Sequence, residues 1–280
     1  MGIEISFVVT CMGRLGMIEQ TFGSAAHQPA SEYVFVDWSC PDKGGDWVEL
    51  NSSPTVQVVR VPGKQFFNLS AARNAGAAVA RGKWLAFLDA DYRLASNFVE
   101  SLLPSLKPEH AYMFFESPSM GGFLVCERDN FKVVQGYDDV LENWGYEDTD
   151  LVQRLSLVGV TITGLPMHLA SHVEHENSLR VKNYSGKDMQ RSITLNHLYS
   201  ALKLDLMTIE DAVNIPRNFR QMLYTTVKEA WEQAVGSRRA KTVSIKLGDL
   251  QIPPRTGKKG QPYVRRQIVY EVSPQEGGER

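Results

Sequence analysis

The chain has 280 residues and a mass of 31.4 kDa, and 43% of its residues are hydrophobic and 22% charged. This apolar share is typical of globular proteins and excludes a disordered or fibrous chain. The formal net charge of −2 points to no polyanionic partner for the chain as a whole. Residues 236–280 differ, because 10 basic and 4 acidic side chains give this segment a net charge of +6.

The cysteine content and the N-terminal segment bear on the compartment. Three cysteines, Cys11, Cys40 and Cys126, are too few for a disulfide framework and indicate a reducing compartment. The N-terminal segment has no basic stretch followed by a long apolar run, so we expect no signal peptide. No window approaches the roughly 18 apolar residues that a transmembrane segment needs. We therefore expect a cytoplasmic protein, with peripheral contact to a membrane as an alternative.

The first part of the chain alternates between apolar runs and helix-forming stretches. Four apolar runs predict buried strands: Ile3–Thr10, Tyr33–Val36, Val56–Val61 and Trp84–Leu88. Arg14–Ala26 is amphipathic, and Leu69–Ala80 is rich in helix formers, with Asn68 as a candidate N-cap. This alternation predicts an α/β fold with a mostly parallel sheet and helices on both faces.

The alternation of apolar runs and helix-forming stretches is less regular in the second part of the chain. Short strands are expected at Ala111–Glu116, Gly122–Cys126, Val160–Thr163 and Met167–Val173. A helix is expected at Glu147–Leu157, because its apolar residues recur at helical spacing and acids in its first turn favour the helix dipole.

The C-terminal part is expected to be an extension of the main domain. Helical sequence is interrupted at Pro216, and two β-prone segments, Val243–Leu247 and Arg265–Val272, flank a linker-like stretch. We therefore expect three parts. They are a main domain over 1–185, a helical extension over 186–235 and a basic tail with short β segments over 236–280.

The first candidate for chemistry is the Asp89-Ala90-Asp91 element, which follows an apolar run directly. In open α/β sheets, ligands gather at the carboxyl ends of strands. With a turn between the acids, one carboxylate can bind a divalent cation and the other a ribose hydroxyl or a metal-bound water. Hard oxygen ligands suit Mg²⁺ or Mn²⁺, and these ions bind a diphosphate. The alternative is a solvated turn that caps the next helix.

Asp37 also follows a strand directly. A carboxylate at this place can accept a hydrogen bond from a ribose hydroxyl or from a base N–H. The alternative is an Asx turn within the segment DWSCPD.

The segment WGYEDTD places an aromatic residue and a glycine before three acids at the start of a helix. One carboxylate can hold an acceptor hydroxyl while another takes its proton, and Trp144 offers a flat face for stacking on a sugar ring. The alternative is a helix N-terminus whose acids only complement the dipole, which leaves the Trp144-Gly145 pair unexplained.

The segment His172-Val173-Glu174-His175 contains a fourth set of candidate ligands. Imidazole is compatible with Mn²⁺ and Zn²⁺. Alone, two histidines and a glutamate make a weak zinc prediction. One histidine added to Asp91 on a shared Mn²⁺ fits the segment better, and a structural histidine is the alternative.

These motifs follow one another in a specific order: Asp37, FNLSAARNAG, LDAD, WGYEDTD and HVEH. In this order the sequence resembles the GT-A fold of nucleotide-sugar glycosyltransferases, in particular glycosyltransferase family 2. The WGYED element and the pattern FN-x-x-A-x-x-N-x-G at Phe67–Gly76 are similar to the β-1,4-galactosyltransferase and chondroitin-polymerase type of domain. The resemblance covers about residues 3–180 and does not extend to residues 200–280.

The resemblance implies a metal-dependent enzyme that inverts the anomeric centre as it moves a sugar from a nucleoside diphosphate sugar, by preference a UDP-sugar, to an acceptor hydroxyl. Asp148 would be the general base and Glu147 would hold the acceptor. Asp91 would bind Mn²⁺ or Mg²⁺ together with His172 or His175, of which His172 is preferred. The donor-binding residues would be Thr10, Arg14, Asp37, Asn68, Arg73, Asn74, Asp89 and Ala90. The acceptor-binding residues would be Trp144, Gly145 and Tyr146, although the family often has Gly or Trp where Tyr146 stands.

Two other function classes compete with this hypothesis. A sugar-1-phosphate nucleotidylyltransferase would use the loop TCMGRLG with Arg14 on phosphate, but this loop lacks a G-G-x-G run. A non-catalytic module would be expected to lose some of the acids, which are all present.

The basic tail allows a further variant of the main hypothesis. Lys258-Lys259 and Arg265-Arg266, with Tyr263 between them, can contact a polyanion such as nucleic acid, anionic lipid or an acidic glycan. An enzyme that glycosylates modified nucleic-acid bases is the corresponding variant, whereas a solvated extension is the favoured interpretation of the tail.

Overall fold

The computed structural model describes residues 2–117, 120–237, 239–246 and 267–273. Internal contacts divide the chain into two compact units, Met1–Asn196 and His197–Arg280. The basic residues predicted to contact a polyanion, which are Lys258, Lys259, Arg265 and Arg266, lie outside the described residues together with Tyr263. That contact therefore stays a prediction.

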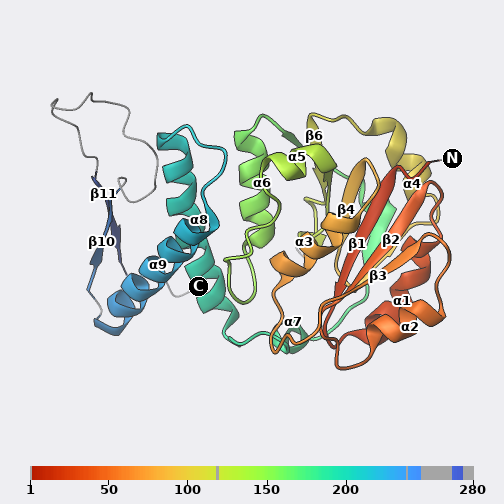
Figure 1. Ribbon diagram of the computed structural model, residues 1–280, viewed down its shortest axis with the longest axis horizontal. Coiled ribbons are helices and arrows are strands. Elements are labelled where there is room, and N and C mark those ends of the chain that lie inside the picture. Colours follow the sequence, from red (N-terminus) through yellow and green to blue (C-terminus); the bar gives the residue numbers. More distant parts are fainter. Residues whose placement is uncertain (1, 118–119, 238, 247–266, 274–280) are drawn as a thin grey trace. The chain divides into compact units, whose positions relative to one another are not determined.

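A seven-stranded sheet forms the centre of the first unit, with the strand order β3-β2-β1-β4-β7-β6-β8 (Figure 1). Its strands are β1 (Ile5–Cys11), β2 (Ser31–Asp37), β3 (Val56–Arg60), β4 (Trp84–Leu88), β6 (His110–Met113), β7 (Leu124–Glu127) and β8 (Thr161–Gly164). β1 is parallel to β2 and to β4, whereas β7 is antiparallel to its neighbours β4 and β6. The predicted α/β fold with a mostly parallel sheet is thereby confirmed.

Helices cover both faces of this sheet (Figure 1). They are α1 (Leu15–Ala26), α2 (Gly44–Leu50), α3 (Leu69–Val79), α4 (Phe98–Leu102), α5 (Arg128–Val133) and α6 (Glu147–Leu157). One buried cluster joins the sheet to α1, α2 and α4, for example through Phe22, Val48 and Phe98. A second cluster joins the opposite face to α5 and α6 through residues such as Phe131 and Leu151. The strand alternation that places successive side chains on opposite faces accounts for the two cores.

A small two-stranded sheet departs from the sequence prediction. The strand expected over Met167–Val173 is instead a 3₁₀ turn, Met167–Leu169, followed by the short strand β9 (Ala170–His172). The amide of Leu169 donates to the carbonyl of Pro166 at 3.1 Å, which closes the turn. β9 pairs antiparallel with β5 (Tyr92–Leu94), so that His172 lies opposite Tyr92. The HVEH segment is thereby brought next to the LDAD element.

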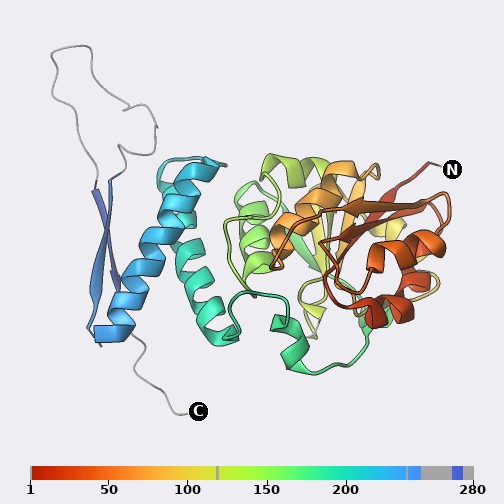
Figure 2. The same ribbon diagram turned by 60° about the horizontal axis from the view of Figure 1, so that its bottom comes forward.

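The second unit combines helical sequence with a β-hairpin. α8 (Met189–Ile209) enters it, and α9 (Arg217–Ser237) begins directly after Pro216. β10 (Lys241–Lys246) and β11 (Gln267–Val272) pair antiparallel and lie along α9 (Figure 2). The buried residues Val243 and Val272 belong to this hairpin. Within the described residues, no helix has the length and apolar character that crossing a membrane requires.

α3 is the helix that carries Arg73 and Asn74, and two features fix its position. Asn68 caps its N-terminus, because its side-chain oxygen accepts a hydrogen bond of 2.8 Å from the amide of Ala71. Gly76 lets the helix approach the sheet closely. A Cβ at this position would lie 2.5 Å from Val8 Cγ1 and 2.9 Å from Val36 Cγ2.

We predict that Gly76→Ala lowers the free energy of unfolding by about 1–3 kcal/mol, because overpacking against two branched side chains outweighs the gain in helix propensity. Gly16→Ala in α1 is the matched control, since a Cβ at Gly16 meets nothing within 4 Å. Urea unfolding followed by circular dichroism compares the two variants. A Gly76→Ala variant as stable as the control would show that the contact between α3 and the sheet is not tight.

Candidate active site

Arg73 connects two acidic motifs that are far apart in the sequence. Its side chain is fully buried, and its guanidinium donates to Asp148 Oδ1 at 2.5 Å and to Asp89 Oδ1 at 2.9 Å. It also donates to the carbonyl of Gly122 at 3.1 Å. Because Asp89 follows β4 and Asp148 lies in the first turn of α6, this one side chain gathers the LDAD and WGYED elements.

The charge on Arg73 is stabilised by its surroundings. Burial alone opposes the charged form, but the attraction of Asp148, and after it that of Tyr137 and Asp89, raises the pKa of Arg73 well above its usual value. The ring of Tyr137 lies 4.9 Å from the guanidinium carbon, and its hydroxyl donates to Asp148 Oδ1 at 3.2 Å. Arg73 and Tyr137 therefore both donate to the same oxygen of Asp148, Oδ1.

Gly122 marks the point where the charged groups converge. A Cβ at this position would lie 2.9 Å from Asp89 Oδ2, 3.2 Å from an Arg73 nitrogen and 3.3 Å from Asp148 Oδ2. The missing side chain therefore keeps open the space that the second oxygens of both carboxylates face. The sequence analysis did not identify Gly122 as a site residue, because it treated the glycine only as the first residue of a short strand over Gly122–Cys126.

Glu147 and Asp148 titrate abnormally because they lie together in a buried place. Burial, and after it the charge of Asp148, raises the pKa of Glu147 from 4.5 to about 8. Burial also raises the pKa of Asp148, while Arg73 opposes this rise. Glu147 is therefore mainly protonated at neutral pH, whereas Arg73 favours the charged form of Asp148.

Asp91 and His175 form a second pair beside the first. His175 Nε2 lies 3.0 Å from Asp91 Oδ2, and both side chains are buried. His175 Nδ1 lies 3.0 Å from the carbonyl of Glu176, which can only accept a hydrogen bond, so Nδ1 carries the proton. In the neutral ring Nε2 then presents its lone pair to the carboxylate. Asp91 Oδ1 is buried and has no hydrogen-bond partner among the described residues.

These observations fit a divalent cation. A cation between Asp91 and His175 would satisfy the facing lone pairs and the unpartnered carboxylate oxygen. A carbonyl on the far ring nitrogen is the usual partner of a metal-binding histidine. In the described part of the chain, no group of three or more His, Cys, Asp or Glu side chains is arranged to hold a metal ion. Mg²⁺ in particular commonly takes one or two protein carboxylates and fills its other positions with substrate phosphates and water.

A cleft at the carboxyl end of the sheet is lined by Asp89 and Asp91, whereas Glu147 and Asp148 are not among its lining residues. Its lining consists of Thr10, Met12, Arg14, Phe67, Leu69, Asp89, Ala90, Asp91, Trp144, His175, Leu179, Arg180, Asn183 and Tyr184. Of the donor residues that the resemblance implies, four lie here: Thr10, Arg14, Asp89 and Ala90. The predicted metal ligand Asp91 and the predicted acceptor residue Trp144 lie here too.

Residues 175–184, which contain α7 (Asn177–Val181), form one wall of the cleft. We call them the strap. Arg14 donates to the carbonyl of Leu179 at 3.0 Å, and the side chain of Asn183 donates to the carbonyl of Met12. The amide of Phe67 donates to the carbonyl of Asn183 at 2.8 Å. The strap is thus tied to the loop after β1 and to the start of α3.

Arg180 on the strap is a cleft residue that the sequence analysis missed. Its guanidinium carbon lies 6.0 Å from the ring of Trp144, and its Nε is buried without a hydrogen-bond partner among the described residues. Together with Arg14 it places two guanidinium groups in a cleft that also holds acids. No sequence motif surrounds Arg180, so only the fold reveals it.

The loop before α6 holds Trp144 in a constrained backbone. Asn143, Gly145 and Tyr146 all have positive φ, with values of 62°, 98° and 76°. Such values are uncommon for residues other than glycine and often occur at functional sites. The side chain of Asn196 donates to the carbonyl of Gly145 at 2.8 Å. Gly145 and Tyr146 therefore set the path of the loop, whereas Trp144 reaches the cleft.

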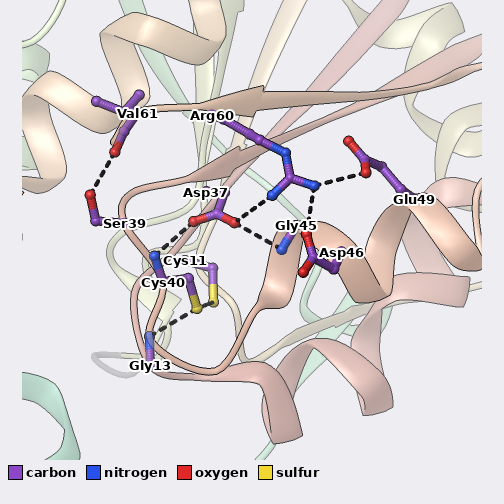
Figure 3. Close-up of polar contacts among 10 residues, drawn as sticks. All are labelled: Cys11, Gly13, Asp37, Ser39, Cys40, Gly45, Asp46, Glu49, Arg60 and Val61. Carbon is purple, nitrogen blue, oxygen red and sulfur yellow. Dashed lines mark hydrogen bonds and ion pairs between the residues drawn. The ribbon is translucent and has the colours of Figure 1, made fainter. Parts of the chain in front are cut away.

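Other predicted residues do not line the cleft. Asp37 accepts from the amides of Cys40 at 2.7 Å and Gly45 at 3.1 Å, which corresponds to the Asx-turn alternative (Figure 3). Asn74 bonds the backbone of Tyr137 with both its side-chain atoms, at 2.8 and 2.9 Å. Asn68 caps α3.

The two predicted metal-binding histidines are placed differently. His175 lines the cleft beside Asp91, whereas His172 belongs to β9 and is not among the lining residues. The order of preference given in the sequence analysis placed His172 first, and the geometry favours His175.

Comparison with protein families gives two matches. The family described as Glycosyl transferase family 2 matches residues 6–135, and the family described as N-terminal domain of galactosyltransferase matches residues 106–178. The first range contains Arg73, Asp89 and Asp91, and the second contains Asp148 and His175. The two matches together cover residues 6–178, and the chain is a glycosyltransferase. No curated protein sequence matches it significantly.

Solved structures of similar fold are also glycosyltransferases. A mannosyltransferase of Pyrobaculum calidifontis, in complex with GDP-Man and Mn²⁺, has a TM-score of 0.56 at 13% identity, over 84% of this chain and 76% of that one. S. aureus TarS with UDP-GlcNAc has a TM-score of 0.57 at 13% identity, over 80% and 72% of the chains. GalNAc-T7 with UDP, GalNAc and Mn²⁺ has a TM-score of 0.55 at 17% identity, over 70% and 48%. At these identities the likeness shows a shared GT-A fold.

We predict that Glu147→Gln stabilises the glycosyltransferase in a pH-dependent way. A carboxyl whose pKa is raised from 4.5 to about 8 on folding leaves stability intact below pH 4.5 and reduces it as the pH rises to about 8. Glutamine has no such proton to lose. The difference in unfolding free energy between the variant and the wild type should therefore grow across this window, to at most about 5 kcal/mol, and then level off.

Urea unfolding between pH 5 and pH 9 measures this difference. Asp150→Asn is the control on the same helix. It should be destabilising, because it removes the carboxylate that pairs with the buried Arg154 at 2.8 Å. A difference between Glu147→Gln and wild type that does not change with pH would contradict the assignment of a protonated Glu147.

Proposed function

We propose that this glycosyltransferase moves a sugar from a nucleoside diphosphate sugar to an acceptor hydroxyl with inversion, and that Asp148 takes the proton of that hydroxyl. The observation that carries the proposal is the convergence of Asp89 and Asp148 on Arg73, beside the pair Asp91 and His175. This arrangement supplies a base, a candidate cation site and a cleft within one small region.

The donor half of the proposal is supported by the cleft lining. Arg14 and Arg180 are suited to a diphosphate, because guanidinium groups match the geometry of phosphate oxygens. Similar folds have been solved with GDP-Man, with UDP and with UDP-GlcNAc. We propose a UDP-sugar as donor. A contact of Asp37 with the ribose or base stays a prediction.

Asp91 and His175 would hold the cation, and we propose Mn²⁺ for this place, because an imidazole ligand suits Mn²⁺ better than Mg²⁺. Bound there, the cation would act as a Lewis acid that neutralises the charge of the departing diphosphate. Asp89, two residues before Asp91, does not share this pair with His175 and forms an ion pair with Arg73. The two acids of the LDAD element thus have separate tasks.

The acceptor half of the proposal depends on Asp148 and its neighbours. Arg73 and Tyr137 occupy Oδ1, whereas Oδ2 lies beside the open position at Gly122. A carboxylate held in this way can accept the proton of a hydroxyl as the hydroxyl attacks the anomeric carbon. Protonated Glu147 can donate a hydrogen bond to the acceptor, and Trp144 can stack on its ring. Attack from this one side predicts inversion.

We predict that Asp148→Asn lowers kcat by about 10²–10⁴-fold, the usual contribution of a general base, while donor binding persists. Asp129→Asn is the control, because Asp129 is an exposed aspartate on α5. Steady-state assays should quantify released nucleoside diphosphate, and product analysis should show inversion. Retention of more than about a tenth of wild-type kcat would exclude Asp148 as the base. Release of pyrophosphate would instead indicate nucleotidyl transfer.

We predict that UDP-sugars raise the melting temperature of the protein only with Mn²⁺. A ligand at about 100 times its Kd stabilises by about 2.7 kcal/mol. His175→Ala should abolish the Mn²⁺-dependent part of the shift, whereas the matched variant His172→Ala should retain it. The same screen includes GDP-sugars and a chelator. Equal responses of the two histidine variants would remove His175 from the proposed cation site.

A further inference from the structure

Two cysteines lie side by side next to the loop after β1 (Figure 3). Cys11 is the last residue of β1, and Cys40 lies in the turn after β2. Their sulfur atoms are 3.7 Å apart, and both thiols are free. Cys11 is buried, whereas Cys40 is only half-buried, so that a small reagent can reach Cys40 first.

The environment of Cys40 stabilises a thiolate. Its sulfur accepts a hydrogen bond from the amide of Gly13 at 3.2 Å. The thiol of Cys11, together with the amides of Gly13, Gly44 and Asp42, lowers the pKa of Cys40 to about 6. The same contact, and after it burial, raises the pKa of Cys11. Cys40 is therefore the nucleophile and Cys11 the resolving thiol.

Charged side chains lie near the pair, and three of them are carboxylates that pair with Arg60. Asp37 accepts from the amide of Cys40 at 2.7 Å. Arg60 lies 3.4 Å from Asp37 Oδ2 and also pairs with Asp46 and Glu49 (Figure 3). Because Arg60 is shared among three carboxylates, it offsets only part of the Asp37 charge, which on its own would disfavour a thiolate nearby.

We propose that Cys11 and Cys40 are a thiol modification site that small disulfides convert to an intramolecular disulfide, and that this bond impairs the donor site. The short distance between the sulfurs and the partial access to one of them support it. The backbone packs closely on the pair at Gly44. A Cβ at Gly44 would lie 3.3 Å from the Cys40 sulfur and 3.6 Å from the Cys11 sulfur.

Oxidised glutathione is the co-reactant of the proposed step. The Cys40 thiolate attacks one sulfur of its disulfide, the disulfide bond breaks, and one glutathione leaves as a thiolate. Cys11 then loses its proton to solvent and attacks the Cys40 sulfur, and the second glutathione thiolate leaves. Starting from the Cys40 thiolate and the Cys11 thiol, the protein loses two electrons and one proton, and the two glutathione thiolates that leave are protonated from solvent. Once Cys40 is a mixed disulfide, the contact that raised the pKa of Cys11 no longer exists.

The link to the donor site is the loop after β1, and this step rests on the proposed function. Thr10, Met12 and Arg14 line the cleft, whereas Cys11 packs into the core on the other face of the sheet. A disulfide draws Cys40 toward Cys11, because the sulfurs must approach to about 2.05 Å. It also removes the thiolate that accepts from Gly13. Because Gly13 directly precedes Arg14, both changes alter the backbone that positions the Arg14 side chain.

The test treats the full-length protein with oxidised glutathione and maps its peptides without reduction. We expect a Cys11–Cys40 cross-link that dithiothreitol reverses. Cys11→Ala should instead accumulate glutathione on Cys40, and Cys40→Ser should accumulate neither product. Cys126→Ala is the control and should behave as wild type, because burial raises the pKa of Cys126 to about 12. Absence of the cross-link in the folded wild type overturns the proposal.

Two further readouts complete the experiment. Iodoacetamide should alkylate Cys40 at a rate that is half-maximal near pH 6, as the lowered pKa requires, whereas an ordinary cysteine responds near pH 8.5. The KM for the donor should rise at least severalfold in the cross-linked protein and return on reduction. An unchanged KM overturns the effect on the donor site. Should the protein transfer no sugar at all, the peptide map still decides the chemistry of the cysteines.

Discussion

The site depends on one buried guanidinium. Taking the charge of Arg73 out of water is costly, and the structure offsets it with two carboxylates, a carbonyl and the ring of Tyr137. Removal of either carboxylate would leave part of the charge uncompensated. The packing of α3 against β4 and α6 and the chemistry of the cleft therefore share the same residues, so that the stability of the fold also keeps the acids in place.

Local sequence patterns predict much of this fold. The four apolar runs in the first part of the chain correspond to β1 to β4, and the cap at Asn68 begins α3 as expected. The helices α2 and α7 were not predicted, because five to seven residues give no readable periodicity. The turn at Met167–Leu169 was mistaken for a strand because its apolar residues contact the core in a different backbone conformation.

The candidate site could be predicted only as far as its residues lie at the ends of strands and helices. Asp89, Asp91 and Asp148 are such residues, and they do converge. Gly122 and Arg180 reach the site only through tertiary contacts, so no spacing in the sequence marks them. The choice between His172 and His175 depends on the pairing of β9 with β5, which neither segment encodes by itself.

The residues at the end of β1 face the cleft on one side and the hydrophobic core on the other. Thr10 and Met12 face the cleft, while Cys11 between them packs into the core and meets Cys40. Since β1 is bonded on both sides, to β2 and β4, it has no free edge along which to slip. One inserted residue would turn the thiol into the cleft and Thr10 into the apolar interior. The length of this strand is thus constrained from both faces, which leaves evolution little freedom for insertions or deletions there.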